Sequence, residues 1–288
     1  MGTLVEEIFS RRLGRSVRAG EIVLVDVDAI MSHDNTTPLA IKAFSEIGKP
    51  IRDAAKIVIH FDHAYPAPNQ LAAENQQKIV KFIRAQGIDN FFHRGVCHQV
   101  MIEEGFIRPG GIVIGGDSHT VTYGALGCFA AGLGSSEIGA AWITGKTWFK
   151  VPETILVRLE GRAPAGVYSK DVMLALAGQL GMDGATYKSL EFAGSYIEDL
   201  PAHQSIVFSN MSVEVGAKCG LIAPDQVTLD YLINETKAQP PFEQFAAVDP
   251  VYERVITLDV SQLQPMVACH PDVDNVKPLS EVAGLEID

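Results

Sequence analysis

Short apolar runs alternate with amphipathic stretches along the first half of the chain. The runs cover residues 21–28, 56–61, 90–93 and 111–115. Their apolar residues are consecutive rather than alternating, which is typical of strands buried on both faces of a parallel sheet. Amphipathic stretches of helical spacing lie between the runs, and this order favours a sheet covered by helices on both sides. The pattern therefore predicts the α/β fold class.

Capping residues mark the ends of the helices that this pattern predicts. A helix is predicted over residues 37–47, because Pro38 suits the first turn of a helix. A longer helix is predicted between Asn69 as its N-cap and Gly87 as its C-cap. Residues 124–145 are rich in glycine and alanine. Such a composition indicates tightly packed helices, or backbone that approaches another segment closely.

The second half of the chain repeats strand and helix patterns after Val151-Pro152. Strands are predicted over residues 154–159, 189–192 and 255–260, helices over 169–180 and 200–219, and a loop over 239–249. We therefore predict a first α/β domain over residues 1–152 and a second over 153–270. Residues 271–288 are predicted to be a linker or the start of a third domain.

Composition limits the kinds of partner that the chain can have. The net charge of -12 gives a nucleic acid no electrostatic attraction, and it disfavours an anionic membrane. No apolar stretch is long enough to span a bilayer, and the first residues lack the apolar segment of a secretory signal. We therefore expect a cytoplasmic protein that binds neither nucleic acid nor membrane.

The cysteines of the chain do not form a recognisable motif. Cys97, Cys128, Cys219 and Cys269 are widely separated, with no CxxC pair. A disulfide framework is not expected at this length and composition, and buried free thiols are the simpler interpretation. Their spacing does not indicate a metal site.

Polar clusters follow the four predicted strands of the first half. They are Ser32-His33-Asp34-Asn35, Asp62-His63, His93-Arg94 and Asp117-Ser118-His119. Ligands of open α/β sheets bind outside the carboxyl ends of the strands. We therefore predict that all four clusters converge on one crevice.

Each cluster also has a purely structural interpretation, and several kinds of function fit the whole set. Asp62-His63 is compatible with a simple turn, and Asp117 with a helix cap. Taken together, the clusters suit a zinc or two-metal hydrolase, a proton-transfer lyase, or a binding module without chemistry. Phosphate-binding glycine motifs and a G-x-S-x-G nucleophile motif are absent from the sequence. These residues alone leave the three classes open.

The order of four motifs resembles the signature of the aconitase superfamily. The motifs are Asp62-His63, Gly95-Val96-Cys97-His98-Gln99, Gly115-Gly116-Asp117-Ser118-His119-Thr120 with Gly124-Ala125-Leu126-Gly127, and Ser209-Asn210-Met211-Ser212-Val213-Glu214-Val215-Gly216-Ala217. The similarity runs from residue 1 to about residue 285 and is greatest to the large subunits of 3-isopropylmalate dehydratase and homoaconitase. It implies three-layer α/β/α domains with mainly parallel sheets. The implied reaction is the dehydration and rehydration of a branched 2-hydroxy di- or tricarboxylate in leucine or lysine biosynthesis. The alternatives are a metal-dependent hydrolase and a non-catalytic fragment.

The resemblance also implies catalytic roles at matching positions. His63, oriented by Asp62, would protonate the departing hydroxyl group. His98 and Asp117 would form a second His–Asp pair, and His119 would hydrogen-bond the hydroxyl or a water molecule. Glu214 would be a proton-handling carboxylate.

Three further residues would contact the substrate or lie near it. Ser118 would bind a substrate carboxylate, and His33 occupies a position where the family has a substrate-contacting polar side chain. Asn210 would lie beside Glu214 in the second domain. Without the resemblance, the spacing of Asn210 and Glu214 fits an ordinary exposed pair on one helix face.

The sequence departs from the family pattern at the cofactor. The family holds a [4Fe-4S] cluster with cysteines in G-S-C-T-N-G and C-G-P-C types of motif, and neither occurs here. We therefore expect the cluster cysteines beyond residue 288 of a full-length protein, with no metal bound by this chain, which would be inactive alone. The resemblance further implies a small, swivelling-domain partner subunit. The sequence does not distinguish isopropylmalate, homocitrate or citrate as substrate.

Overall fold

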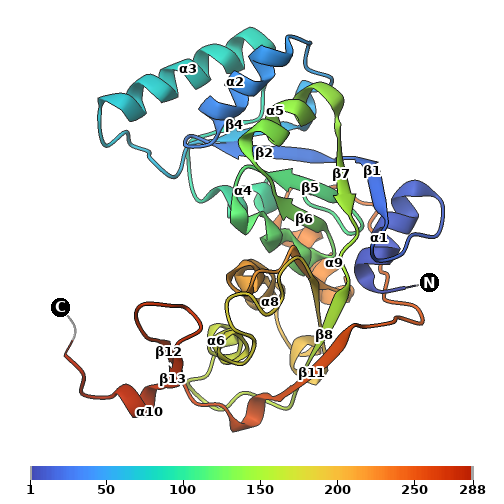
Figure 1. Cartoon of the computed structure of the whole chain (residues 1–288), viewed down its shortest axis with the longest axis vertical. Helices are drawn as coiled ribbons and strands as arrows, with labels where there is room; N and C mark the ends of the chain where they lie inside the picture. The colour runs from blue at the N-terminus through green and yellow to red at the C-terminus, as the bar shows by residue number, and fades with distance from the viewer. Residues whose placement is uncertain (1, 287–288) are drawn as a thin grey trace.

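The computed structural model describes residues 2–286, and a five-stranded sheet dominates the first half of the chain (Figure 1). Its order is β4-β3-β2-β5-β6, and every neighbouring pair of strands is parallel. The strands are β2 (Ala29–His33), β3 (Ile57–His60), β4 (Phe91–Phe92), β5 (Ile112–Gly115) and β6 (Phe129–Gly132). The parallel sheet predicted from consecutive apolar residues is confirmed.

Helices cover both faces of this sheet and make three layers. One face packs against α1 (Leu4–Leu13), α2 (Thr37–Ile47), α3 (Gln70–Gln86) and α5 (Ser135–Thr144). The other face packs against α4 (Cys97–Glu103) and α9 (Gln226–Glu235). Strand β3 shows why its apolar residues are consecutive, since Ile57 and Ile59 join the first core and Val58 joins the second. A strand between two helical layers buries both of its faces.

The predicted helix caps are present at α3. The Asn69 side chain accepts a hydrogen bond from the Ala72 N–H at 2.9 Å. Gly87 follows the helix with a φ of 63°, a left-handed conformation that glycine adopts at little cost. These two residues stop the helix at both ends, as predicted.

The strand predicted over residues 21–28 is present, but it lies outside the main sheet. β1 (Ile22–Asp26) pairs antiparallel with β7 (Lys146–Lys150), and only β2 enters the main sheet. Asp28 separates them, because its carboxylate accepts a hydrogen bond from the Ile112 N–H at 2.8 Å and pairs with Arg12. The prediction missed β2 because the last two residues of this strand, Ser32 and His33, are polar and were assigned to the cluster after it.

A second parallel sheet lies in the second half of the chain. Its order is β10-β9-β8-β11, with β8 (Thr154–Glu160), β9 (Ser189–Ala193), β10 (Cys219–Ile222) and β11 (Arg254–Asp259). Its core includes residues of α6 (Ser169–Leu180), α7 (Ser195–Glu198) and α8 (Ala202–Asn210). The second half also contains short 3₁₀ helices at Met211–Val215 and Val260–Gln262. Those of the first half are Ala54–Lys56 and Ser118–Leu126. Mainly parallel sheets with helices on both sides are consistent with the predicted fold class.

One prediction for the second half was wrong. The helix expected over residues 200–219 is α8, a 3₁₀ turn and then strand β10. Gly216 ends the helical part with a φ of 81°. Near the segment predicted to be a linker or the start of a third domain, the chain forms a hairpin of β12 (Met266–Ala268) and β13 (Val276–Pro278), followed by α10 (Leu279–Val282).

Backbone contact joins the two sheets near residue 124. A Cβ atom added to Gly124 would lie 1.8 Å from the Gly220 carbonyl oxygen of β10, so only glycine fits. The close approach expected within residues 124–145 is therefore present. After β10, the chain returns to the first sheet, where Leu232 of α9 and Ala238 join the core around Tyr123. As predicted, residues 239–249 contain neither helix nor strand.

No helix within residues 2–286 has both the length and the apolar character that crossing a membrane requires.

Candidate active site

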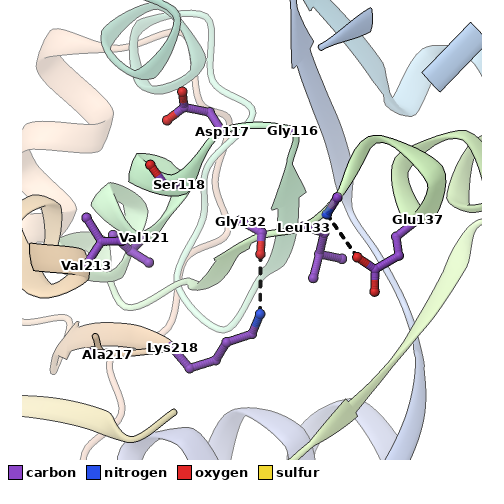
Figure 2. Close-up of a pocket in the computed structure, with 11 residues that line it drawn as sticks. Gly116, Asp117, Ser118, Val121, Gly132, Leu133, Glu137, Val213, Ala217 and Lys218 are labelled. Carbon is purple, nitrogen blue, oxygen red and sulfur yellow. Dashed lines mark hydrogen bonds between the residues drawn. The ribbon is translucent and has the colours of Figure 1, made fainter. Parts of the chain in front are cut away.

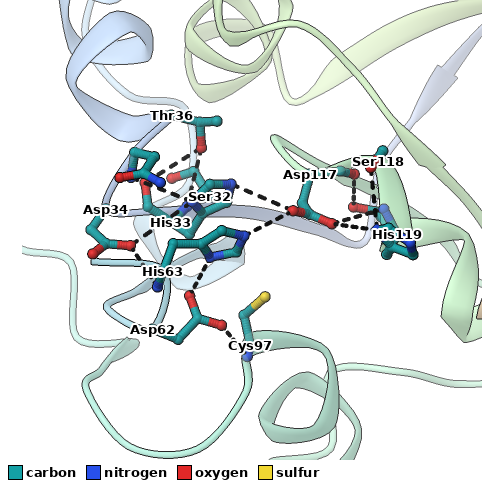
Figure 3. A network of polar contacts seen from close by, with 12 residues as sticks. Ser32, His33, Asp34, Thr36, Asp62, His63, Cys97, Asp117, Ser118 and His119 are labelled. Atoms are coloured by element: carbon teal, nitrogen blue, oxygen red, sulfur yellow. Dashed lines mark hydrogen bonds and ion pairs between the residues drawn. The ribbon is translucent and has the colours of Figure 1, made fainter. Parts of the chain in front are cut away.

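The carboxyl ends of the central strands bring a group of histidines and aspartates together (Figure 3). His33 is the last residue of β2, Asp62 and His63 follow β3, and Asp117 follows β5. β2 lies between β3 and β5 in the sheet, so the three strand ends are neighbours. His98 joins them from α4. Parallel strands thus place residues that are far apart in sequence at one edge.

Asp117 is the centre of the network. Its Oδ1 lies 2.8 Å from His98 Nε2 and accepts a hydrogen bond from the His119 N–H at 2.7 Å. Its Oδ2 lies 3.3 Å from His63 Nε2 and 3.6 Å from His33 Nε2. Burial alone would raise the pKa of Asp117, but its hydrogen bond with His98 and the surrounding donors hold that pKa well below its usual range. Asp117 is therefore a fixed negative charge among several imidazoles.

Asp62 orients His63 within this network. The Asp62 Oδ1 lies 2.8 Å from His63 Nδ1, and its Oδ2 accepts a hydrogen bond from the Cys97 N–H at 2.6 Å. Partial burial lowers the pKa of His63, but the hydrogen bond with Asp62 and the negative charge of Asp117 outweigh burial and raise it. The His63 side chain is 34% exposed, so solvent or a ligand can reach it. These properties suit a proton donor near neutral pH.

His33 is the buried neighbour of His63. The two rings stack with their centroids 3.7 Å apart and their planes 13° from parallel. Burial and the nearby charge of His63 lower the pKa of His33. Asp34 holds the loop after β3, because its carboxylate accepts hydrogen bonds from the His63 and Ala64 N–H groups. Of the two stacked rings, His63 is thus the one that binds a proton more readily.

Residues of the second half reach the other side of Asp117. The Glu214 Oε1 lies 3.1 Å from His119 Nε2, and the Asn210 side chain donates to the Thr122 hydroxyl at 2.9 Å. Asn210 ends α8 and Glu214 lies in the following 3₁₀ helix, so the two do not share one α-helical face. Ser118 Oγ lies 3.3 Å from His119 Nδ1. Both second-half residues nevertheless contact the segment that carries His119.

One predicted cluster lies outside this network. Arg94 pairs with Glu104, and the His93 ring lies 5.8 Å from that of Tyr65. Within residues 2–286, neither side chain has a hydrogen bond or an ion pair with the network around Asp117. The prediction that all four clusters converge was wrong for this one, because β4 lies at the edge of the sheet, beyond β3.

Sequence reasoning also missed two supporting groups. The Tyr123 hydroxyl lies 3.2 Å from His98 Nδ1, opposite the nitrogen that contacts Asp117. The backbone N–H of Cys97 donates to the Asp62 carboxylate and holds it in place. Tyr123 lies four residues after His119, between the two parts of the motif that contains His119. A backbone donor leaves no side-chain signal in a sequence.

Four of the site's side chains have the geometry of a possible metal site. Ligand atoms of His33, Asp34, Asp62 and His63 all lie within 4.8 Å of one another. Imidazole nitrogens and carboxylate oxygens suit zinc and related ions. However, both carboxylates already accept hydrogen bonds from backbone N–H groups. A metal ion would have to compete with these bonds.

A comparison with protein families identifies relatives of this chain. The family model for the aconitase family (aconitate hydratase) matches residues 6–286. The chain belongs to the aconitase family. Its membership places the chain among the hydro-lyases.

Individual relatives of the aconitase family cover nearly the whole chain. The chain is 43% identical over 290 residues to the 3-isopropylmalate dehydratase large subunit 1 of Methanopyrus kandleri. This match covers 99% of this chain and 69% of that protein. It is 45% identical over 291 residues to a probable 3-isopropylmalate dehydratase large subunit of Methanothermobacter thermautotrophicus, with the same coverage. A probable methanogen homoaconitase large subunit of the same organism is 44% identical over 294 residues, covering 99% of this chain and 68% of that protein.

Large subunits of the aconitase family generally carry a [4Fe-4S] cluster, and the cysteines here test whether one fits the described residues. Cys97, Cys128 and Cys219 are buried, and Cys269 lies apart after β12. Burial raises the pKa of Cys219 to about 12 and also raises those of Cys97 and Cys128, so these thiols do not ionise readily. Within residues 2–286, the group of side chains close enough to share a metal contains no cysteine. These residues do not fit an iron–sulfur cluster.

Proposed function

We propose that this chain is the catalytic large subunit of a hydro-lyase that isomerises a branched 2-hydroxy di- or tricarboxylate by dehydration and rehydration. The substrate class is that of 3-isopropylmalate dehydratase or homoaconitase, the names carried by relatives that are 43% and 44% identical. The supporting observation is the accessible His63, which is paired with Asp62 at 2.8 Å and faces Asp117 at 3.3 Å. Such an enzyme would serve leucine or lysine biosynthesis.

In this proposal, His63 supplies the proton that converts the departing hydroxyl into water. Asp62 fixes the orientation of the ring, because it accepts from Nδ1 and leaves Nε2, which lies 3.3 Å from Asp117 Oδ2, as the nitrogen that would give up the proton. Asp117 stabilises the protonated ring before transfer and is held in place by His98. A fixed carboxylate beside the acid favours the charged imidazole and sets the pH range in which it can act.

The residues around His119 and Glu214 would make the other contacts with the substrate. His119 would hydrogen-bond the hydroxyl or a water molecule, and Glu214 would move a proton through its 3.1 Å contact with His119. Ser118 would bind a substrate carboxylate, with Asn210 holding the segment at Thr122. His33, stacked on His63, would complete the polar lining.

We also propose a small-subunit partner, because the relatives named above are large subunits. The proposed site is open to such a partner, since the side chains of His63, His119 and Glu214 are 34%, 36% and 33% exposed. Residues 1–152 and 153–270 would act as two units, with His63 and Asp117 in one and Glu214 in the other.

Glu214→Gln tests the proposal in the complete enzyme with its small subunit. Turnover of 3-isopropylmalate or homocitrate should fall by ~10²-fold or more, as is usual for a lost acid–base group. Substrate binding should change much less. Glu235→Gln on α9, an exposed carboxylate, is the matched control and should keep normal turnover. Near-normal turnover of Glu214→Gln would show that Glu214 is an ordinary surface residue.

The group formed by His33, Asp34, Asp62 and His63 favours a second candidate, a metal-dependent hydrolase. Zinc titration of the wild-type chain and of His63→Asn distinguishes the two functions. Stoichiometric zinc binding that disappears in His63→Asn, together with zinc-dependent ester hydrolysis, would support the hydrolase. Dehydration of a 2-hydroxy dicarboxylate without zinc would exclude it.

A further inference from the structure

A cavity opens beside the proposed proton-transfer residues. This cavity of about 430 Å³ is lined by Asp117, Ser118 and Val213, by the glycine-rich segment that precedes α5, and by Lys218 (Figure 2). Its volume lies within the range of ~300–1,000 Å³ that small-molecule sites usually have. Because Asp117 and Ser118 belong to both, the cavity is an extension of the site around His63.

Lys218 is the cation of this cavity. Its Nζ donates to the Gly132 carbonyl oxygen at 3.3 Å and lies 5.8 Å from the centres of the Phe149 and Tyr187 rings. No carboxylate of residues 2–286 lies within ion-pair distance of it. Burial lowers the pKa of Lys218, because the charged ammonium group has lost part of its hydration. A carbonyl oxygen and two rings only partly replace that hydration.

The cavity also contains a carboxylate that does not neutralise Lys218. The Glu137 Oε2 accepts a hydrogen bond from the Gly134 N–H at 2.9 Å and caps the start of α5. This bond holds Glu137 at the helix end, as Figure 2 shows, while Lys218 is directed toward Gly132. Among the described residues, the positive charge in the cavity therefore has no carboxylate within ion-pair distance.

A polyanionic substrate needs such a charge. The chain carries a net charge of -12, and the site itself presents Asp62, Asp117 and Glu214. These charges repel a dicarboxylate unless a cation lies close to it. Among the residues that line this cavity, Lys218 is the one Lys or Arg.

We infer that Lys218 and Ser118 form a carboxylate subsite, in which one carboxylate of the substrate lies between the ammonium group and the hydroxyl. Figure 2 places the two residues on opposite sides of the cavity. This inference rests on the proposed function in one respect, because that function identifies the ligand as a hydroxy-dicarboxylate. Lys218 would determine affinity and specificity for the dicarboxylate rather than transfer a proton.

Two substitutions test the subsite in the complete enzyme. Lys218→Met keeps the length of the side chain and removes its charge, whereas Lys218→Arg keeps the charge. Lys218→Met should raise KM at least ~10-fold, as expected for a lost charged hydrogen bond, and should change kcat by less than ~3-fold. Lys218→Arg should restore most of the affinity. Lys78→Met, an exposed lysine of α3, is the matched control and should leave KM unchanged.

Succinate provides a probe that does not require turnover. We expect succinate to bind to the wild-type protein and to Lys218→Arg but not to Lys218→Met, as measured by calorimetry, with thermal unfolding checking that each variant is folded. Turnover by the wild type with an unchanged KM and unchanged succinate binding in Lys218→Met would overturn the subsite and leave the proposed function intact. Succinate binding that depends on Lys218, without turnover of any hydroxy-dicarboxylate, would support the subsite and refute the proposed function.

Discussion

His60 provides a direct test of how burial controls charge beside the site. It ends β3, its side chain is 0% exposed, and neither ring nitrogen has a hydrogen-bond partner among the described residues. Its ring stacks on Phe92 with the centroids 5.5 Å apart. Burial lowers the pKa of His60 from 6.5 to about 4, despite the opposing charge of Asp62. The folded protein therefore keeps this imidazole neutral.

The pKa shift makes stability depend on pH in a defined direction. Between pH 6.5 and about 4, the unfolded chain binds a proton at His60 that the folded chain does not bind. This contribution to stability is therefore complete above pH 6.5 and is lost as the pH falls. For an unfolded pKa of 6.5 and a folded pKa of about 4, the free energy of unfolding falls by about 2 kcal/mol between pH 7.5 and pH 5.0.

His60→Leu removes the titrating group and leaves an apolar side chain of similar size. At pH 7.5, the free energy of unfolding of the variant should exceed that of the wild type by about 1–3 kcal/mol, because two unpaired buried nitrogen atoms are removed. At pH 5.0, its advantage over the wild type should be larger by about 2 kcal/mol, for the reason given above. Any change in packing against Phe92 is the same at both pH values and cancels from this second comparison.

Urea unfolding of both proteins at pH 7.5 and 5.0 measures these differences. His203→Leu is the matched control, because it makes the same substitution at an exposed histidine of α8. An equal difference between wild type and His60→Leu at the two pH values would refute the reasoning. His60 would then be hydrated or hydrogen-bonded in solution.

Two further predictions concern the orientation of His63 and the junction between the sheets. Asp62→Asn removes the carboxylate 2.8 Å from His63 Nδ1, so the pKa of His63 should fall, and NMR titration would detect the change. The alkaline limit of activity should move to lower pH with it, and an unchanged titration would mean that Asp117 alone controls His63. Gly124→Ala places a methyl group 1.8 Å from the Gly220 carbonyl oxygen and should destabilise the protein by more than about 2 kcal/mol in urea unfolding. Full stability of that variant would show that the two sheets separate at this contact without loss.

The sequence by itself determined the elements that depend on local patterns. Consecutive apolar residues identified β3 and β5, because a strand between two helical layers buries every side chain. Asn69 and Gly87 located the ends of α3, because capping depends on one residue and its immediate neighbours. The polar residues after β3 and β5 were recognisable for the same reason, since they follow directly on a buried run.

Only the tertiary structure decided which of these residues meet. Strand order brings His33, His63 and Asp117 together and leaves His93 at the edge, and no local pattern encodes that order. The contact between His119 and Glu214 joins residues 95 positions apart. The separation of β1 from β2 and the unpaired charge of Lys218 likewise depend on partners that are distant in sequence. Burial and charge are properties of the folded arrangement, so the pKa values of His60 and Asp117 follow from the packing around them.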